Sequence, residues 1–267
     1  MKIAFLQFNP TFGDVEGNVD KALSLISNFD FDLIVFPELF NTGYLFLDRS
    51  EVEAFAEDVP NGYTCKRLMK YASDRGVFIV AGLAERSMGK LYNSAVIVGS
   101  KGIIGVYRKA HLFNREKLLF DAGNLDFNVY DLGFAKIGVM ICFDWCFPEV
   151  ARILAIKGAD IICHPSNLVL PYAIMVMRAR AIENRVYIIT ANRVGFEERD
   201  GLKLRYIGLS QIVSPDMNVL CSAGEDEEVV GVIDVDVSLA RNKWITPLNH
   251  VFNDRRIDLY KHLASNV

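Results

Sequence analysis

Short apolar runs recur along the chain and are separated by polar turns. Valine, isoleucine and phenylalanine dominate these runs, which is the composition of strands buried in a sheet. The runs predict strands at Lys2–Phe8, Asp32–Glu38, Val77–Glu85, Asn93–Val98, Ile103–Lys109, Ala135–Cys142, Asp160–His164, Val186–Asn192 and Ile207–Val213.

Between several of these runs, apolar positions recur with helical spacing. Helices are predicted at Asn18–Ser27, Cys65–Arg75, Pro148–Lys157 and Tyr172–Asn184. Leu23, Leu25 and Ile26 give the first of them an apolar side. Pro148 suits a first helical turn, and Gly158 suits the position just past a helix end.

The order of these segments predicts an α/β fold with mixed sheets. A helix between two strands implies a parallel connection, whereas the tight Glu85–Asn93 and Gly99–Ile103 connections predict hairpins. So many strands are expected to split into two packed layers with helices outside. No linker or repeat interrupts the pattern, so residues 1–267 are expected to form a single domain.

Composition narrows the class of protein. The chain has 267 residues, of which 51% are hydrophobic, and this supports a large core. A net charge of −4 gives no basic field, so neither nucleic acid nor an anionic membrane is an expected partner. No apolar run reaches the roughly 18 residues of a membrane span. An odd number of cysteines, five, favours a reducing compartment, and a cytoplasmic location is expected.

A carboxylate, an amine and a thiol each end a predicted strand. Glu38 closes DLIVFPE, Lys109 closes IIGVYRK and Cys142 closes AKIGVMIC. Taken singly, each has an ordinary interpretation, since a cysteine after VMI is most often a small buried hydrophobe. Ligands bind outside the carboxyl ends of strands in open α/β sheets. Together, the three side chains are expected to meet at one rim.

These groups suffice for acyl transfer. A cysteine is nucleophilic as its thiolate, which Lys109 and a helix N-terminus at Pro148 would favour. Glu38 can take the thiol proton and pass it to a leaving group. The Lys109 ammonium and the backbone N–H of Phe143 can stabilise an oxyanion.

The segments FPELFNTGY, YRKAHLF and GVMICFDWCFPEVAR resemble the three motifs of the nitrilase superfamily, the carbon–nitrogen hydrolases. Order and spacing match, and the resemblance runs from MKIAFLQFNP to Asp254–Arg256. It implies that Glu38 is the general base, Lys109 the oxyanion stabiliser and Cys142 the nucleophile. The segment EKLLFDAG resembles a fourth family element, which implies that Glu116 positions substrate and lysine.

The resemblance also implies an architecture and a set of partners. The family fold is a four-layer αββα sandwich with two packed mixed sheets, which agrees with the layer argument above. Family members usually form homodimers, so a homodimer or higher homo-oligomer is expected. The expected partner is a small-molecule amide or nitrile substrate, with no metal and no organic cofactor.

Residues after the nucleophile indicate a branch of the superfamily. True nitrilases usually carry Trp-Glu there, whereas this chain has Phe143-Asp144-Trp145, as in amidases and carbamoylases. HPSNLVLPYA and IENRVY resemble small aliphatic amidases. The resemblance therefore implies hydrolysis of a small aliphatic amide through a cysteine thioester, with release of ammonia. The alternatives are an aliphatic nitrilase and an N-carbamoyl amidohydrolase of the carbamoylputrescine or ureidopropionate type.

Three residues are predicted to bind substrate: Phe143, Trp145 and Asn167. Trp145 lies three positions past the nucleophile and Asn167 lies in the loop after a predicted strand, although Trp145 fits an ordinary core aromatic equally well. His164 is a general base by residue type. Its place in IICHPSN favours instead a pocket wall or a satisfied hydrogen bond.

Two rival readings are weaker. Cys142, Cys146, Cys163 and His164 have spacings that suggest zinc, but neighbouring strand residues such as Cys163 and His164 point to opposite faces. A binding protein that keeps the superfamily fold would be expected to have a damaged triad. Here glutamate, lysine and cysteine are all present.

Overall fold

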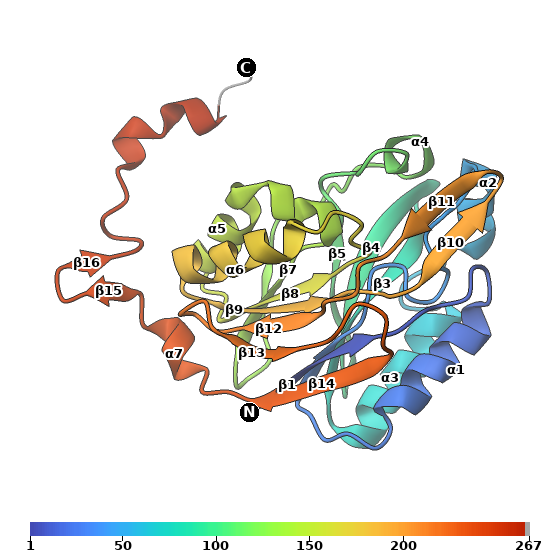
Figure 1. Cartoon of the computed structure of the whole chain (residues 1–267), viewed down its shortest axis with the longest axis horizontal. Coiled ribbons are helices and arrows are strands. Elements are labelled where there is room, and N and C mark those ends of the chain that lie inside the picture. Colours follow the sequence, from blue (N-terminus) through green and yellow to red (C-terminus); the bar gives the residue numbers. More distant parts are fainter. Residues whose placement is uncertain (265–267) are drawn as a thin grey trace.

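Two mixed six-stranded sheets pack against each other in the computed structural model, which describes residues 1–264 (Figure 1). The first sheet has the order β14 (Val229–Asp234), β1 (Lys2–Gln7), β2 (Leu33–Val35), β3 (Phe78–Ser87), β4 (Lys90–Gly99) and β5 (Gly102–Arg108). The second has the order β13 (Val219–Ser222), β12 (Gln211–Val213), β9 (Tyr187–Ala191), β8 (Ile161–Pro165), β7 (Lys136–Val139) and β6 (Val129–Asp131). Parallel pairs run through β1–β2–β3 and through β7–β8–β9.

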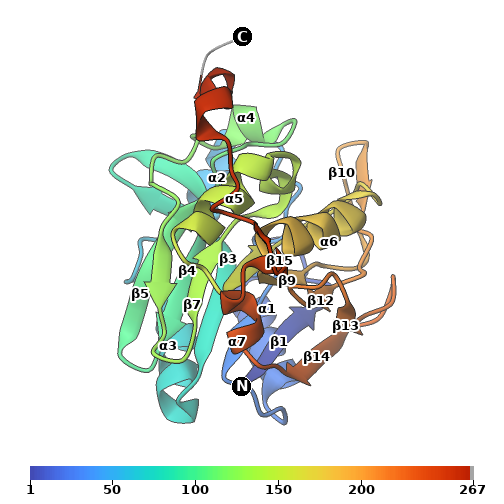
Figure 2. The same cartoon turned by 90° about the vertical axis from the view of Figure 1, so that its left-hand side faces the viewer.

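Helices cover the outer face of each sheet. α1 (Val15–Ile26) and α3 (Tyr63–Arg75) pack on the first, and α5 (Pro148–Ile156) and α6 (Ala173–Asn184) pack on the second (Figures 1 and 2). Strand β1 shows the reason, since Ile3 and Phe5 join the core between the sheets while Ala4 and Leu6 join the core beneath the helices. The predicted four-layer αββα sandwich is confirmed.

The remaining elements are short. They are α2 (Arg49–Phe55), α4 (Glu116–Leu119), α7 (Ser238–Arg241), the 3-10 turns η1 (Cys142–Cys146), η2 (Ile257–Leu259) and η3 (Lys261–Ala264), and the two hairpins β10 (Phe196–Arg199) with β11 (Leu202–Arg205) and β15 (Trp244–Thr246) with β16 (Asn249–His250).

The sequence pattern located the long elements and overextended several strands. All four predicted helices form, and both predicted hairpins, β3–β4 and β4–β5, are present. The strand predicted at Asp32–Glu38 ends at Val35, and that predicted at Ala135–Cys142 ends at Val139. Glu38 and Cys142 therefore lie in connections beyond their strands. Strands β10 and β11 were missed because they are polar, with the sequences FEER and LKLR.

The C-terminal arm, residues 244–264, leads away from the sheets (Figure 1). Phe252 packs against the core, but many other large apolar side chains of the arm are exposed; they include Trp244, Ile245, Leu248, Ile257, Leu259 and Leu263. No helix within residues 1–264 is long and apolar enough to cross a bilayer.

Candidate active site

The predicted triad lies where the two sheets meet. Glu38 follows β2 and Lys109 follows β5 in the first sheet, whereas Cys142 opens η1 just after β7 in the second. The three groups therefore come together as expected, but from the strand ends of two sheets and not of one. The sequence pattern identified strand ends correctly but could not show which sheet each strand would join.

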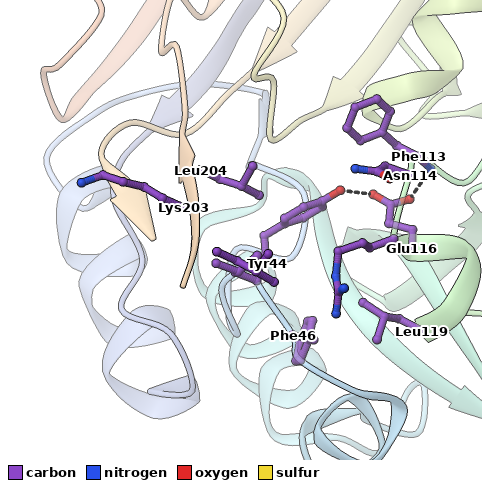
Figure 3. Close-up of a pocket in the computed structure, with 11 residues that line it drawn as sticks. Tyr44, Phe46, Phe113, Asn114, Glu116, Leu119, Lys203 and Leu204 are labelled. Atoms are coloured by element: carbon purple, nitrogen blue, oxygen red, sulfur yellow. Dashed lines mark hydrogen bonds between the residues drawn. The ribbon is translucent and has the colours of Figure 1, made fainter. Parts of the chain in front are cut away.

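Lys109 connects two buried carboxylates. Its Nζ donates to Oε1 of Glu38 at 2.6 Å and to Oε1 of Glu116 at 2.7 Å. The Tyr44 hydroxyl donates to the same Glu116 oxygen at 2.6 Å (Figure 3), and the Asn93 amide donates to Glu38 Oε1 at 2.7 Å. Glu38 Oε2 is buried and has no hydrogen-bond partner among residues 1–264, which leaves one carboxylate oxygen available to a proton.

The opposite charges in this group stabilise one another. Burial alone lowers the pKa of Lys109, but the carboxylates of Glu116 and Glu38 outweigh burial, so the net pKa lies above its usual range. Burial raises the pKa of Glu116, and the Lys109 cation opposes that rise. The lysine is therefore a permanent cation between two acids.

Cys142 sits at a strained backbone position. Its φ is +40°, a region that non-glycine residues rarely adopt. Burial raises the pKa of the thiol well above its ordinary value, the Glu38 charge adds to the rise, and Lys109 opposes it. Lys109 thus lowers the pKa of the thiol, as expected from the sequence. Burial has the larger effect, however, so the thiol is protonated when no substrate is bound.

Asp144 fastens the turn that carries Cys142 to the strand that carries Lys109. Its Oδ2 accepts from the Ile141 backbone N–H at 2.8 Å and from the Tyr107 hydroxyl at 2.7 Å. Its Oδ1 accepts from the His111 backbone N–H at 3.1 Å and from His111 Nδ1 at 2.8 Å. One carboxylate therefore fixes the two segments relative to each other.

His164 is a buried residue with satisfied hydrogen bonds. Burial lowers its pKa to about 4, so the ring is neutral near pH ~7. Its Nε2 donates to the Cys142 carbonyl oxygen at 2.9 Å, which leaves Nδ1 to accept from the Thr190 hydroxyl at 3.2 Å. The ring is hydrogen-bonded to the backbone of Cys142 and does not face solvent.

A recess of about 10 Å³ opens at Cys142. It is lined by Phe113, Cys142, Phe143, Trp145, Asn167, Leu168, Val169 and Leu170. The three residues predicted to bind substrate thus share one recess with the thiol, and their contact with substrate stays a prediction. Asn167 Nδ2 donates to the Glu38 carbonyl at 2.8 Å, and its Oδ1 has no partner among residues 1–264.

A second cavity, of about 130 Å³, lies on the other side of Phe113. Tyr44, Phe46, Glu116, Leu119 and Leu204 are among its lining residues (Figure 3). Its walls are mainly apolar, and its polar lining residues are Tyr44, Asn114, Arg115, Glu116 and Lys203. The charged group around Lys109 is therefore reached from this side as well.

Sequence reasoning missed Tyr44, Asn93 and Asp144. Tyr44 and Asp144 lie inside the quoted motifs, in FPELFNTGY and GVMICFDWCFPEVAR, so a polar side chain within a motif was an available signal. Asn93 has no such signal, because its contact with Glu38 depends on the pairing of β3 and β4.

The zinc alternative has no geometric support. Within the described part of the chain, no three His, Cys, Asp or Glu side chains are grouped as a metal ion would need. Cys146 is exposed, whereas Cys142 and Cys163 are buried.

Comparison with known proteins defines the class. The profile of the carbon-nitrogen hydrolase family matches residues 2–243. The chain therefore belongs to this family, and the predicted resemblance to the nitrilase superfamily is confirmed.

Individual relatives are similar over almost their whole length. A protein named nitrilase from Pyrococcus abyssi is 54% identical over 97% of this chain and 99% of its own. An N-carbamoylputrescine amidase from Solanum lycopersicum is 33% identical over 98% of this chain and 94% of its own. The crystal structure of a carbon-nitrogen hydrolase from Helicobacter pylori G27 covers 100% of this chain and 99% of its own, with a TM-score of 0.88 and 27% identity.

Proposed function

We propose that this carbon–nitrogen hydrolase cleaves small aliphatic amides through a thioester on Cys142 and releases ammonia. The observation that carries the proposal is the buried Lys109 ammonium, bonded to Glu38 and Glu116, whose charge acts on the neighbouring thiol. An acid–base group, a fixed cation and a nucleophile are the parts that acyl transfer requires.

Acylation begins at the thiol. Glu38 takes the proton of Cys142 as Sγ bonds to the amide carbon, and the carbonyl electron pair moves onto oxygen. The Lys109 ammonium and the Phe143 N–H donate to that oxyanion. The carbon–nitrogen bond then breaks as Glu38 returns the proton to nitrogen, so ammonia leaves and the acyl group remains on sulfur.

Deacylation repeats the proton transfer with water. Glu38 takes a proton from water as the water oxygen adds to the thioester carbon. Collapse of the adduct expels the thiolate, which recovers the proton from Glu38, and the carboxylic acid is released. Glu116 and Tyr44 keep Lys109 in place through both steps by their hydrogen bonds.

The recess at Cys142 supports a short aliphatic acyl group. Trp145, Leu168 and Leu170 give it apolar walls, which suit the alkyl part of such a group. Asn167 Oδ1 supplies an acceptor that suits the N–H of an amide.

Nitrile hydrolysis is the second candidate, because the Pyrococcus abyssi relative at 54% identity is named a nitrilase. Cys142 would then attack the nitrile carbon and form a thioimidate. N-carbamoyl substrates are the third, since the Solanum lycopersicum relative is named an N-carbamoylputrescine amidase.

The deciding experiment measures ammonia release from matched panels of short amides, N-carbamoyl amines and nitriles. Wild type is compared with Cys142→Ala and with Cys146→Ala, which removes an exposed thiol on the same turn. We expect release from short amides, loss of all turnover in Cys142→Ala and retention in Cys146→Ala. Release from nitriles alone would keep the nucleophile and overturn the substrate class, and turnover by Cys142→Ala would overturn the mechanism.

We also propose that the protein is a homodimer whose C-terminal arm contacts the partner. The exposed apolar side chains of the arm are poorly suited to water, and a second copy would cover them. Light scattering should report a dimer for wild type and a monomer for the double variant Leu248→Glu, Leu259→Glu. Met88→Glu changes an exposed side chain on the β3–β4 turn and should stay dimeric. A dimeric double variant would refute the role of the arm.

A further inference from the structure

The β10–β11 hairpin contributes one buried charge to the site. Glu197 is 7% exposed, although the hairpin around it is largely polar and exposed. Its carboxylate accepts from the Leu45 N–H at 2.7 Å and from the Tyr44 N–H at 3.1 Å. It also accepts from Arg193 Nη1 at 2.6 Å and from the Tyr206 hydroxyl at 2.9 Å. Four neighbouring residues therefore hold this carboxylate in one position.

The loop before Tyr44 is shaped around that carboxylate. Gly43 has a φ of +79°, and a Cβ placed there would lie 2.6 Å from Glu197 Oε1. Only glycine lets the backbone adopt this turn and approach the carboxylate so closely. The close approach of the loop to the Glu197 carboxylate therefore depends on glycine at position 43.

Tyr44 connects the Glu197 carboxylate to the charged group around Lys109. Its ring packs edge-on against Tyr206, with 6.2 Å between ring centroids, and lies beside the hairpin residue Leu204 (Figure 3). Its hydroxyl donates at 2.6 Å to the Glu116 oxygen that also accepts from Lys109. Because hydrogen bonds weaken steeply with misalignment, the position of the Tyr44 backbone governs the contact at its hydroxyl.

We propose that Glu197 is a positioning residue that acts through Tyr44 to hold Glu116 and Lys109 in their working geometry. The proposal rests on the function proposed above. Glu197 touches neither substrate nor thiol in this arrangement. Its effect reaches the reaction through the aligned hydroxyl of Tyr44.

The same hairpin offers a matched control. Arg199 donates to Glu51 Oε2 at 2.8 Å and to the Leu45 carbonyl at 3.0 Å, and it stacks on Phe12. It therefore ties the hairpin to the same loop from the solvent side, without contacting Tyr44. A substitution at Arg199 loosens the hairpin while it leaves the Tyr44 N–H bonded to Glu197.

The experiment is a double-mutant cycle with Glu197→Gln and Tyr44→Phe, assayed with propionamide and with thermal unfolding as the fold check. Each single variant should lower kcat about tenfold, the size of one lost hydrogen bond to a charged group, with little change in KM. Because Glu197 is proposed to act only through the Tyr44 hydroxyl, which Tyr44→Phe already removes, the double variant should be no slower than the slower single variant. Effects that multiply to about a hundredfold would overturn the proposal.

The control cycle pairs Arg199→Gln with Tyr44→Phe. Arg199→Gln should lower thermal stability with little loss of kcat in either background. If Arg199→Gln instead lowers kcat about tenfold and this loss disappears in the Tyr44→Phe background, the hairpin acts as a whole and the specific role of Glu197 is refuted.

A second measurement separates this proposal from the proposed function. Iodoacetamide alkylates Cys142 as Sγ displaces iodide and loses its proton, so its rate reports the Lys109 field without amide turnover. Peptide fragmentation distinguishes Cys142 from the exposed Cys146, which serves as the internal reference. If no amide is hydrolysed but the alkylation rates show the same non-additive cycle, the positioning role stands and the function fails. Unchanged alkylation of Cys142 in Glu197→Gln would refute the positioning role.

Discussion

The two halves of the site handle burial in opposite ways. The half attached to the first sheet buries full charges, namely Glu38, Lys109 and Glu116, within hydrogen-bond distance of one another. In the half attached to the second sheet, the nucleophilic candidate and the neighbouring histidine are neutral, and the buried Asp144 carboxylate is compensated by four hydrogen bonds. There, burial keeps the Cys142 thiol protonated and lowers the pKa of His164 to about 4.

The difference has an energetic reason. A buried charge costs several kcal/mol unless partners compensate it, and the first half supplies those partners from inside the group. The second half avoids the cost at Cys142 and His164, because these two groups stay uncharged. Cys142 can become a thiolate only when its proton has an acceptor, and in the proposed mechanism the unpartnered Oε2 of Glu38 is that acceptor across the sheet interface. The proton transfer therefore couples the two halves.

Glu38→Gln tests this coupling and should have the largest effect. The amide cannot accept the thiol proton, so steady-state ammonia release should fall about 10² to 10⁴-fold. Deacylation should suffer most, and intact-mass spectrometry should detect acyl groups retained on Cys142. Glu85→Gln is the matched control, because Glu85 is a buried carboxylate on β3 that pairs with Arg108 away from the thiol. A near-normal rate in Glu38→Gln would remove the acid–base role.

Lys109→Met breaks the compensation in the first half. Without the cation the Glu38 and Glu116 carboxylates repel each other, and we expect a loss of about 3 to 5 kcal/mol in the free energy of unfolding. The pKa of Glu116, which the cation no longer opposes, then rises further above its ordinary value, so the folded state binds extra protons and the variant loses stability as pH rises. Urea unfolding at about pH 5 and about pH 8 should show the smaller deficit at the lower pH. Equal deficits at both would contradict the compensation argument.

His164→Asn tests the neutral half. In wild type the folded ring is neutral down to about pH 4, whereas the unfolded ring takes a proton near its ordinary pKa of 6.5. The unfolded state therefore binds more protons between these values, and stability falls as pH falls. Between about pH 7 and pH 5 this histidine should account for about 2 kcal/mol of lost stability. The gap between wild type and His164→Asn should shrink by that amount, since carboxylates common to both proteins cancel. A gap that stays constant would show that the ring is not buried as a neutral group.

The sequence singled out the three triad residues better than the contacts that support them. Glu38, Lys109 and Cys142 stand at the ends of apolar runs and inside ordered motifs, so pattern alone singles them out. The layers follow from the same apolar alternation, as Ile3 and Ala4 illustrate on β1. Which groups share a cavity was harder, because it depends on how two sheets face each other.

The supporting contacts could not be predicted from the sequence, and the reason is physical. Glu197 lies 153 positions from Tyr44, and no local pattern links them. Strand β10 carries Glu197 in a polar ribbon whose sequence resembles an ordinary loop. The resting protonation of Cys142 was equally hidden, because burial, which decides it, is a property of the folded structure.

Tyr107→Phe is the mildest test of how the halves are joined. The hydroxyl on β5 donates one of four hydrogen bonds to Asp144, which belongs to the turn of Cys142. Its removal should cost about 1 kcal/mol of unfolding free energy. It should also lower kcat measurably, because the Lys109 strand and the Cys142 turn lose a shared anchor.

Tyr130→Phe is the matched control for that test. Its hydroxyl also bonds the same strand, donating to the Val106 carbonyl at 3.1 Å, but it reaches neither Asp144 nor the site. Both variants should lose similar stability in denaturant unfolding, and only Tyr107→Phe should lose kcat. If the two variants kept equal kcat, the remaining three hydrogen bonds to Asp144 would suffice to align the halves. If both lost it equally, strand β5 as a whole, and not the Asp144 contact, would set the alignment.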